Sequence, residues 1–204
     1  MENKMNNTYK VVVIDSSPLF FLGLRIILKN SHRNIELTNL FKTKNDLYEY
    51  AANHRIGMVI VNFTHADNPF KIIKDIINIK TAIPAVKIFV YTGEKNSVLI
   101  KLLFDIGVSA IVSRNESASQ LADFIHLAMQ GEFVYSPLYI DSLIRDNLKM
   151  LTNRELDVLM EIHNGLSLTH ISQMLHKSIK TISNNKRSAM QKLGVSHKLE
   201  LEFI

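Results

Sequence analysis

Residues 178–195, SIKTISNNKRSAMQKLGV, combine the side-chain types that bind and read nucleic acid. Arginine and lysine donate to guanine and to phosphate, asparagine forms two hydrogen bonds with adenine, and serine bonds adaptably. The segment lies in a stretch between Glu161 and Glu200 that contains no acidic residue, which avoids repulsion with phosphate. A basic run is also typical of a plain solvated helix face, so the elements around it must distinguish the two interpretations.

The spacing of its apolar residues predicts that this segment is a helix with two unlike faces. Four of them recur at the intervals of one helical face and should hold the helix on its neighbours: Ile179, Ile182, Met190 and Leu193. The opposite face then carries outward the side chains that could contact DNA: Lys180, Ser183, Asn184, Lys186 and Arg187.

Two shorter helices are predicted immediately before this one. Thr152 and Glu155 have the spacing of a capping box, in which hydroxyl and carboxylate satisfy each other's backbone amides, and Gly165 follows that helix. Ser167 can cap a second, short helix, and three residues then separate it from the helix at 179–193. Short helix, tight turn and long helix are the layout of a helix-turn-helix, whose second helix enters the major groove.

Residues 151–195 resemble the LuxR/FixJ (NarL)-type DNA-binding domain. The family pattern is roughly L-T-x-R-E-x-x-V-L, then G-x-S-x-x-x-I-A, then S-x-K-T-[VI], then K-L-G-V, and the blocks of this chain have the same order and spacing. The resemblance implies that Ser183, Asn184 and Arg187 contact base edges. It implies contacts to the DNA backbone by a second set: Lys177, Lys180, Thr181 and Lys186. Asn185 stands where the family usually has a histidine, which leaves the target sequence open.

The first 130 residues alternate short β-branched runs with amphipathic segments. Nearly continuous apolar runs predict strands buried on both faces at 9–15, 35–41, 57–63, 85–92 and 108–113. Helical periodicity lies between them, at 18–29, 44–53, 69–80, 95–106 and 117–130. The pattern predicts an α/β doubly wound parallel five-stranded domain at 1–130, a linker at 131–148, and an all-α helix-turn-helix domain at 149–204.

The acidic end of the first predicted strand and the following PLFFLGL, residues 18–24, resemble the start of the response-regulator receiver domain. Receivers are phosphorylated on an aspartate after the third strand, with Mg²⁺ held by that aspartate and by an acidic pair after the first. The resemblance places the functional positions of this chain at Asp15, Ser16, Asn62, Thr92 and Arg114. We therefore expect a degenerate pocket, in which a serine replaces one carboxylate, a neutral amide replaces the acceptor and an arginine replaces the usual lysine.

Other chemistry finds little support in the sequence. Asp67, five residues beyond Asn62, is interpreted as a turn residue rather than a substitute acceptor, and a small ligand in the vacated pocket is the lesser alternative. The eight histidines have no metal-ligand spacing, and the absence of cysteine excludes disulfides and thiolate zinc sites. The sequence therefore predicts neither an enzyme nor a cofactor nor a metal site.

Composition is that of a globular protein, with 47% hydrophobic and 21% charged residues and a net charge of +5. No apolar stretch reaches the length of a membrane span, and the first ten residues carry no export signal. We expect a soluble cytoplasmic protein.

The predicted helix at 18–29 carries two apolar stripes. One should face the sheet and consists of Phe20, Leu24, Ile27 and Leu28. The second, Leu19, Leu22 and Ile26, has little polar cover and predicts a subunit interface, together with the helix at 117–130 beside it. The alternative is that the linker folds over this stripe.

These observations predict a DNA-binding transcriptional regulator that acts independently of aspartyl phosphorylation on double-stranded DNA. Residues 178–195 are especially similar to the response regulators of the Rcs phosphorelay, so the protein could act as a homodimer or as a heterodimer with an Rcs-type response regulator. The rival interpretation is an interaction protein that sequesters another transcription factor without reading DNA itself.

Overall fold

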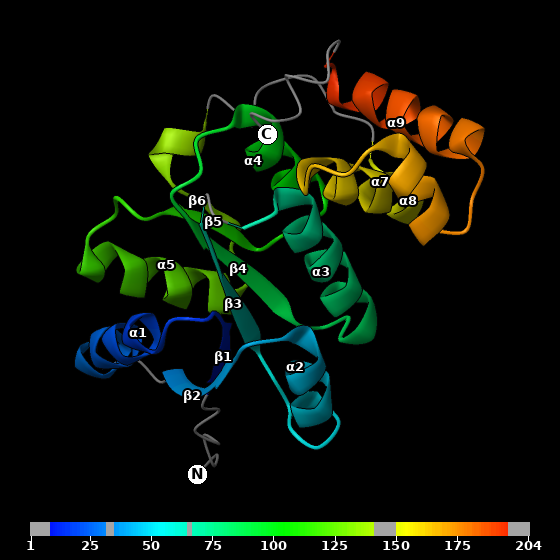
Figure 1. Cartoon of the computed structure of the whole chain (residues 1–204). Coiled ribbons are helices and arrows are strands. Elements are labelled where there is room, and N and C mark those ends of the chain that lie inside the picture. The colour runs from blue at the N-terminus through cyan, green and yellow to red at the C-terminus, as the bar shows by residue number, and fades with distance from the viewer. Residues whose placement is uncertain (1–8, 32–34, 65–66, 141–149, 196–204) are drawn as a thin grey trace. The chain divides into compact units, whose positions relative to one another are not determined.

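The computed structural model describes residues 9–31, 35–64, 67–140 and 150–195 (Figure 1). The chain forms two compact units: Met1–Phe63 with Asn78–Gly93 and Val108–Leu138, and Thr64–Ile77 with Glu94–Gly107 and Tyr139–Ile204. Because these units interleave along the sequence, the domain boundaries predicted after residues 130 and 148 stay a prediction. Part of the predicted linker, residues 141–148, and the predicted end of the last domain, 196–204, lie outside the described residues.

The first unit contains one parallel sheet with the strand order β2-β1-β3-β4-β5-β6. Its strands are β1 (Tyr9–Ile14), β2 (Ile35–Phe41), β3 (Met58–Phe63), β4 (Lys87–Thr92), β5 (Ala110–Ser113) and β6 (Val134–Tyr135). The order reverses between β1 and β3, where Ile14 pairs with Val61. In open parallel sheets such a reversal leaves a crevice beyond the carboxyl ends of the strands, and the predicted pocket residues lie at these ends.

Strand β6 corrects the predicted count of five strands to six. It lies inside the segment expected to be a linker, and it pairs in parallel with β5 through Ala110–Val134 and Ile111–Tyr135. A two-residue strand is too short to show the alternation by which strands are predicted, so no sequence pattern marked it. A short 3₁₀ turn, η1 (Pro137–Tyr139), follows it.

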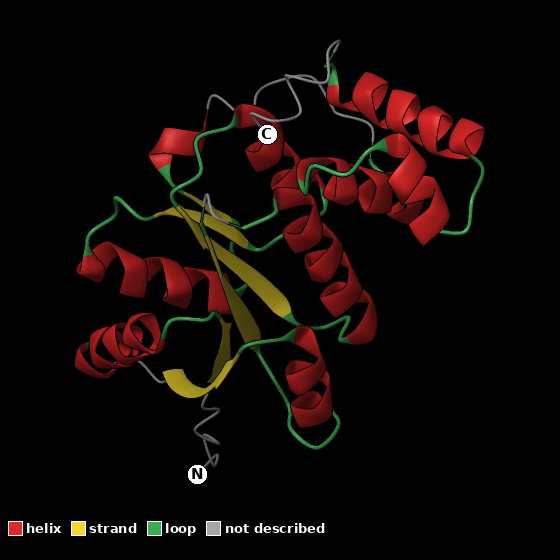
Figure 2. Ribbon diagram, viewed as in Figure 1, coloured by secondary structure: helices red, strands yellow, loops and turns green. Residues whose placement is uncertain are grey.

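Helices α1 (Pro18–Asn30) and α5 (Ala118–Gln130) lie on one face of the sheet, and α2 (Lys44–Ala51) lies on the other (Figures 1 and 2). Leu24 and Leu28 of α1 are buried in the core under these helices, while Phe20 and Ile27 are partly buried against it, which confirms the predicted inner stripe. The core continues through the sheet and α5 with Val11, Val13, Ile60, Phe89, Leu121 and Ile125. Helix α3 (Pro69–Ala82) contributes residues to both units.

The second unit contains α4 (Ser97–Asp105), α7 (Asn153–His163), α8 (Leu168–Met174) and α9 (Ile179–Leu193). The predicted capping box is present, because Thr152 Oγ1 accepts from the amide of Glu155 and the carboxylate of Glu155 accepts from the amide of Thr152. Ser167 and Ser178 cap α8 and α9. None of the helices in the described part of the chain has the length and apolar character needed to cross a membrane.

Packing of α9 on its neighbours confirms most of the predicted inner face and corrects one residue. Ile182 and Leu193 are buried, Met190 is half-buried, and Ala189 is buried as well. Ile179, however, is 50% exposed. Helical spacing predicts the side on which a residue lies, but not where along the helix axis the neighbouring helices end, and Ile179 stands in the first turn.

Candidate nucleic-acid interface and phosphorylation pocket

The residues expected to contact bases lie on one side of α9. Asn184 and Arg187 are exposed and stand three positions apart, and Ser183, four positions before Arg187, is half-buried. Residues at these spacings are neighbours on a helix surface, so the three side chains form one patch. The structure thus brings together an amide, a guanidinium and a hydroxyl, which are groups that can read base edges in a major groove.

The residues expected to contact the DNA backbone surround the first turns of α9. Lys177, Lys180 and Thr181 are exposed, and Lys186 is half-buried. The Thr181 hydroxyl is 2.8 Å from the hydroxyl of Ser178, and the Thr181 amide donates to Ser178 Oγ at 3.1 Å. These bonds fix the start of the helix, where a positive dipole end and exposed lysines both favour phosphate.

One lysine of α9 is turned away from this surface. Lys192 Nζ donates to Glu155 Oε2 at 2.7 Å, and Ser188 Oγ donates to Glu155 Oε1 at 2.6 Å. The Glu155 side chain is only 5% exposed. Burial acts to raise the pKa of this carboxyl, but the hydrogen bonds from Lys192, Ser188 and Thr152 outweigh it and lower the pKa to about 2. Sequence reasoning found the capping role of Glu155 but missed this link between α7 and α9.

The turn between α8 and α9 contains a strained residue. His176 has φ 52°, and among the described residues it is the one position outside glycine with a positive φ. Its amide donates to Gln173 O at 3.2 Å, and the Lys177 amide donates to Ser172 O at 2.9 Å. A residue in the left-handed region reverses the chain quickly, and this reversal sets the direction in which α9 leaves α8.

At the carboxyl ends of the strands, the structure brings three of the five predicted pocket residues together. Asn62 Nδ2 donates to Asp15 Oδ2 at 2.5 Å, and Arg114 Nη2 donates to Asn62 Oδ1 at 2.5 Å. The other oxygen of Asp15, Oδ1, accepts from the amide of Ser17 at 3.1 Å. Each carboxylate oxygen of Asp15 therefore accepts a hydrogen bond, and the side-chain amide of Asn62 bridges Asp15 and Arg114.

The remaining pocket residues lie around this centre. Ser16 is exposed, and Thr92 is buried at the end of β4, where its carbonyl accepts from the Arg114 amide at 2.9 Å. Asp67 Oδ2 accepts from the amide and the hydroxyl of Thr64 at 2.8 and 2.9 Å, as the interpretation of a turn residue requires.

Two aromatic residues that the sequence did not assign to this pocket, Phe20 and Tyr91, lie beside it. The rings of Tyr91 and Phe20 are stacked, with centroids 5.3 Å apart and an interplanar angle of 16°. The guanidinium carbon of Arg114 lies 5.9 Å from the centroid of Tyr91. Burial raises the pKa of the Tyr91 hydroxyl, an effect that nearby Arg114 partly offsets. Strands β3 and β4 pair so that Asn62 lies opposite Tyr91. This pairing is the one feature that could have indicated that Tyr91 lies beside the pocket.

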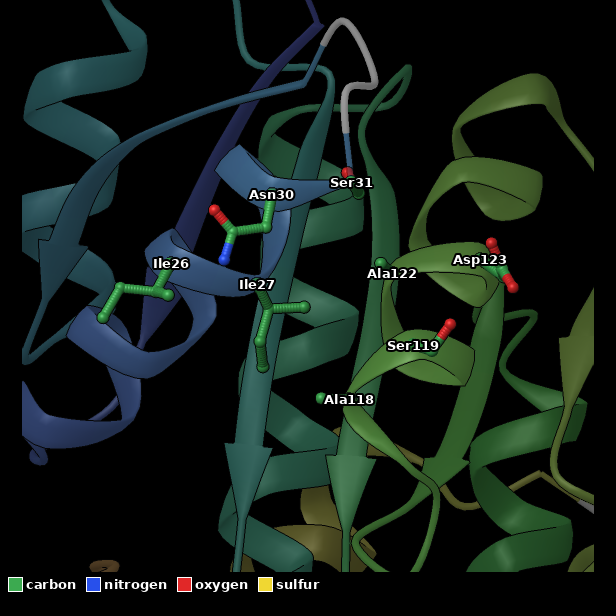
Figure 3. A pocket seen from close by; sticks show the side chains of 8 residues that line it. All are labelled: Ile26, Ile27, Asn30, Ser31, Ala118, Ser119, Ala122 and Asp123. Atoms are coloured by element: carbon green, nitrogen blue, oxygen red, sulfur yellow. The ribbon is translucent and has the colours of Figure 1, made fainter.

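The outer stripe of α1 is exposed as predicted, with Leu19 at 79%, Leu22 at 46% and Ile26 at 61%. Beside it, a groove of about 400 Å³ lies between α1 and α5 (Figure 3). Ile26 and Ile27 line its α1 side, and Ala118, Ser119 and Ala122 line its α5 side. An exposed apolar stripe next to a groove with small side chains is a surface suited to another helix.

Comparison with known proteins adds to this geometry. Residues 149–202, which contain α7, α8 and α9, match the family of bacterial regulatory proteins called the luxR family. The C-terminal helices form a luxR-type domain. The resemblance that the motifs predicted is thereby confirmed, and α8 and α9 are the two helices of its helix-turn-helix.

Other similarities extend over nearly the whole length of the chain. It is 25% identical over 205 residues to the transcriptional regulatory protein RcsB of Escherichia coli (strain K12), covering 96% of this chain and 93% of that protein. It is 23% identical over 199 residues to the response regulator protein VraR of Staphylococcus epidermidis, covering 88% of this chain and 94% of that protein.

Solved structures resemble this chain in fold. RcsB from Salmonella enterica serovar Typhimurium, bound to the promoter rprA in the presence of the phosphomimetic BeF₃⁻, has a TM-score of 0.67 at 25% identity and covers 96% of this chain and 97% of its own. A structure of two RcsB dimers bound to two parallel DNAs has a TM-score of 0.61 at 24% identity, covering the same shares. In fold the chain thus resembles RcsB, with a parallel sheet followed by an all-helical region that contains the helix-turn-helix.

Proposed function

We propose that this protein is a transcriptional regulator that binds double-stranded DNA in the cytoplasm, has no catalytic activity of its own and acts without aspartyl phosphorylation. The observation that carries the proposal is the match of α7–α9 to the luxR family, combined with the exposed patch of Ser183, Asn184 and Arg187 on α9. Four flanking residues would hold the DNA backbone: Lys177, Lys180, Thr181 and Lys186.

Independence from phosphorylation is supported by the pocket of the first unit. An amide nitrogen is no nucleophile for phosphoryl transfer, and Asn62 stands where a receiver has its acceptor aspartate. Asp15 directs both carboxylate oxygens to hydrogen-bond donors, and Ser16 supplies no second carboxylate. Phosphoryl transfer in receivers needs a metal ion to neutralise charge, and of the three carboxylates that serve as acceptor and metal ligands in receivers this pocket retains Asp15.

Pairing of two chains is supported by the exposed stripe of Leu19, Leu22 and Ile26 and by the groove beside it. Helix α1 carries Arg25 and Lys29 and no acid, while α5 carries Asp123 and no basic residue except His126. Opposite charges would therefore meet if α1 of one chain lay against α5 of another. Dimers also suit the target, since one helix-turn-helix reads one half-site and two half-sites lie about 10 bp apart.

The partner in this pair is either a second copy or an Rcs-type response regulator. The similarity to RcsB over 96% of this chain supports the second possibility, because related sheets present related helix faces. The rival function, sequestration of another regulator without DNA reading, uses the same α1 surface but leaves the patch on α9 without a role.

A gel-shift experiment tests the proposal. Purified full-length protein is mixed with genomic fragments, and bound fragments are recovered and sequenced, with Arg187→Ala as the matched variant that should fold normally because Arg187 is exposed. We expect a set of shifted fragments with a shared motif, lost with Arg187→Ala and insensitive to acetyl phosphate. Absence of any shifted fragment, together with inhibition of a co-purified regulator's own gel shift, would establish sequestration instead.

A further inference from the structure

Six residues of the first unit form a closed ring of contacts around the vacated pocket. The Ser17 amide donates to Asp15 Oδ1, Asn62 links Asp15 to Arg114, and Arg114 lies against Tyr91. Tyr91 stacks on Phe20, and the Phe20 amide returns to Ser17 Oγ at 3.4 Å. The ring therefore starts and ends in the first turn of α1.

Asn62 is suited to its place in this ring because an amide both donates and accepts. Its nitrogen meets a carboxylate and its oxygen meets a guanidinium, and hydrogen bonds to charged groups are stronger than those between neutral ones. An aspartate at this position could accept from Arg114 but would have no donor for Asp15, and two carboxylates would then face each other. The residue that removes phosphorylation is thus also the residue that completes the ring.

The aromatic half of the ring holds the side chain of Phe20. Two aromatic rings that stack stabilise each other beyond the effect of burying their surface. A guanidinium near a ring face adds a further attraction. Phe20, Asn62 and Tyr91 are all half-buried, so these contacts lie at the edge of the core, where local opening would otherwise begin. Leu19 and Leu22 of the exposed stripe flank Phe20 on the same helix.

We propose that the degenerate pocket is a permanent clamp, formed by Asp15, Ser17, Phe20, Asn62, Tyr91 and Arg114, that fixes the first turn of α1 and so keeps the Leu19–Leu22 surface in one orientation. In this chain, residues at the carboxyl ends of β1, β3, β4 and β5 are linked to the start of α1 through this ring, and Tyr91 of β4 is the member whose side chain contacts a side chain of α1. The clamp does not depend on DNA binding or on the identity of a partner, and it can be tested on the full chain alone.

The clamp is tested by hydrogen exchange and mass spectrometry, which measure how fast the backbone amides of residues 15–22 exchange, in buffer with EDTA. The variants are Asn62→Asp, Arg114→Ala and Tyr91→Leu, with Tyr91→Phe as the conservative variant that keeps the ring stack. Arg55→Ala, which removes an exposed arginine outside the clamp, is the matched control. We expect each of the three disruptive variants to speed exchange of the amides at 15–22 by about tenfold, with α5 unchanged. Tyr91→Phe and Arg55→Ala should exchange like the unaltered protein.

Two results would overturn the clamp. One is unchanged exchange at 15–22 in Asn62→Asp and Arg114→Ala while both remain folded by circular dichroism. The other is faster exchange spread evenly over the sheet, α1 and α5, which would mean a general loss of stability. Neither result bears on the gel shift of the unaltered protein, so failure of the clamp and failure of the proposed DNA binding are separate outcomes.

Discussion

Glu155 and Lys192 join the first turn of α7 to the last turn of α9 through a hydrogen-bonded ion pair of 2.7 Å. The carboxylate is nearly inaccessible, and Ser188 and Thr152 donate to it as well. An ionised group held in this way stabilises the fold only while it stays ionised, and this makes the stability of the helix-turn-helix dependent on pH.

The first prediction follows from the lowered pKa of Glu155. The folded pKa of Glu155 is about 2, below the ordinary glutamate value of 4.5, so its contribution is complete above pH 4.5 and is lost as the pH falls towards 2. At neutral pH this contribution is about 3 kcal/mol. We expect Glu155→Gln to lower the free energy of unfolding by about this amount at pH 7, with the difference from the unaltered protein closing at pH 2. Denaturant unfolding followed by circular dichroism at both pH values checks this, and a difference that is constant with pH would contradict it.

The second prediction concerns the dependence of DNA affinity on salt concentration. Because the exposed lysines of α9 would replace counterions on phosphate, log K against log[salt] should fall by about 0.9 for each phosphate contacted. Lys180→Ala should weaken binding to all sequences alike and make the slope shallower by about 1. Lys29→Ala, an exposed lysine on α1, is the control and should leave the slope unchanged. Fluorescence anisotropy over a salt series measures both, and an unaltered slope in Lys180→Ala would remove that residue from the interface.

A third prediction separates residues that contact bases from residues that contact the DNA backbone. Asn184→Ala and Arg187→Ala should each cost about 1–3 kcal/mol on the specific site and relax the preference for one base pair, with little effect on random DNA. Competition binding against single-base variants of the site gives the specificity ratio. Equal losses on specific and random DNA would show that these residues contact only the backbone.

For the pocket, we predict that acetyl phosphate with Mg²⁺ neither phosphorylates the protein nor changes its affinity for DNA. Phosphate-affinity electrophoresis checks this, and a phosphate-dependent shift that disappears in Asn62→Ala would contradict it. Asn62→Asp alone should also fail, since Arg114 would pair with the new carboxylate and Ser16 still supplies no metal ligand. Restored phosphorylation should require at least Asn62→Asp together with Ser16→Asp.

The fifth prediction tests the exposed stripe of α1. Leu22→Glu with Ile26→Glu introduces two carboxylates into an apolar surface and should convert a dimer into a monomer or abolish co-purification with an Rcs-type regulator. Light scattering and pull-down measure these effects. Phe133→Glu places a single carboxylate at an exposed apolar residue outside α1 and should change neither. A folded double variant with unaltered association would assign the interface elsewhere.

Much of this molecule was predictable from local patterns. The strand at 57–63 was read from GMVIVNF, and its residues Met58–Val61 are all buried. The capping box of Thr152 and Glu155 also follows from spacing alone, because its partners are three residues apart. The pocket positions were predicted from the resemblance to receiver domains, and the parallel sheet brings them near one another because its strands end at the same edge.

Contacts between distant residues could not be predicted in this way. Ser188 and Lys192 are 33 and 37 residues from Glu155, and nothing in the sequence near Glu155 indicates that its second role lies on another helix. The stack of Phe20 on Tyr91 likewise depends on how α1 is placed over β4. Such contacts are set by packing, whereas periodicity and caps are set by the neighbouring residues along the chain.

Strands β2 and β6 are the two edges of the sheet, and β6 pairs with the side of β5 that faces away from β4. It covers the outer side of β5, where the amides of Val134 and Ser136 donate to the carbonyls of Ser109 and Ile111. The other border is β2, whose register against β1 shifts between Val11 and Val12 and whose Glu36 is exposed. Irregular register and outward charge are features that discourage strand addition and aggregation at an edge. These features favour association through helix surfaces over association by extension of the sheet at β2.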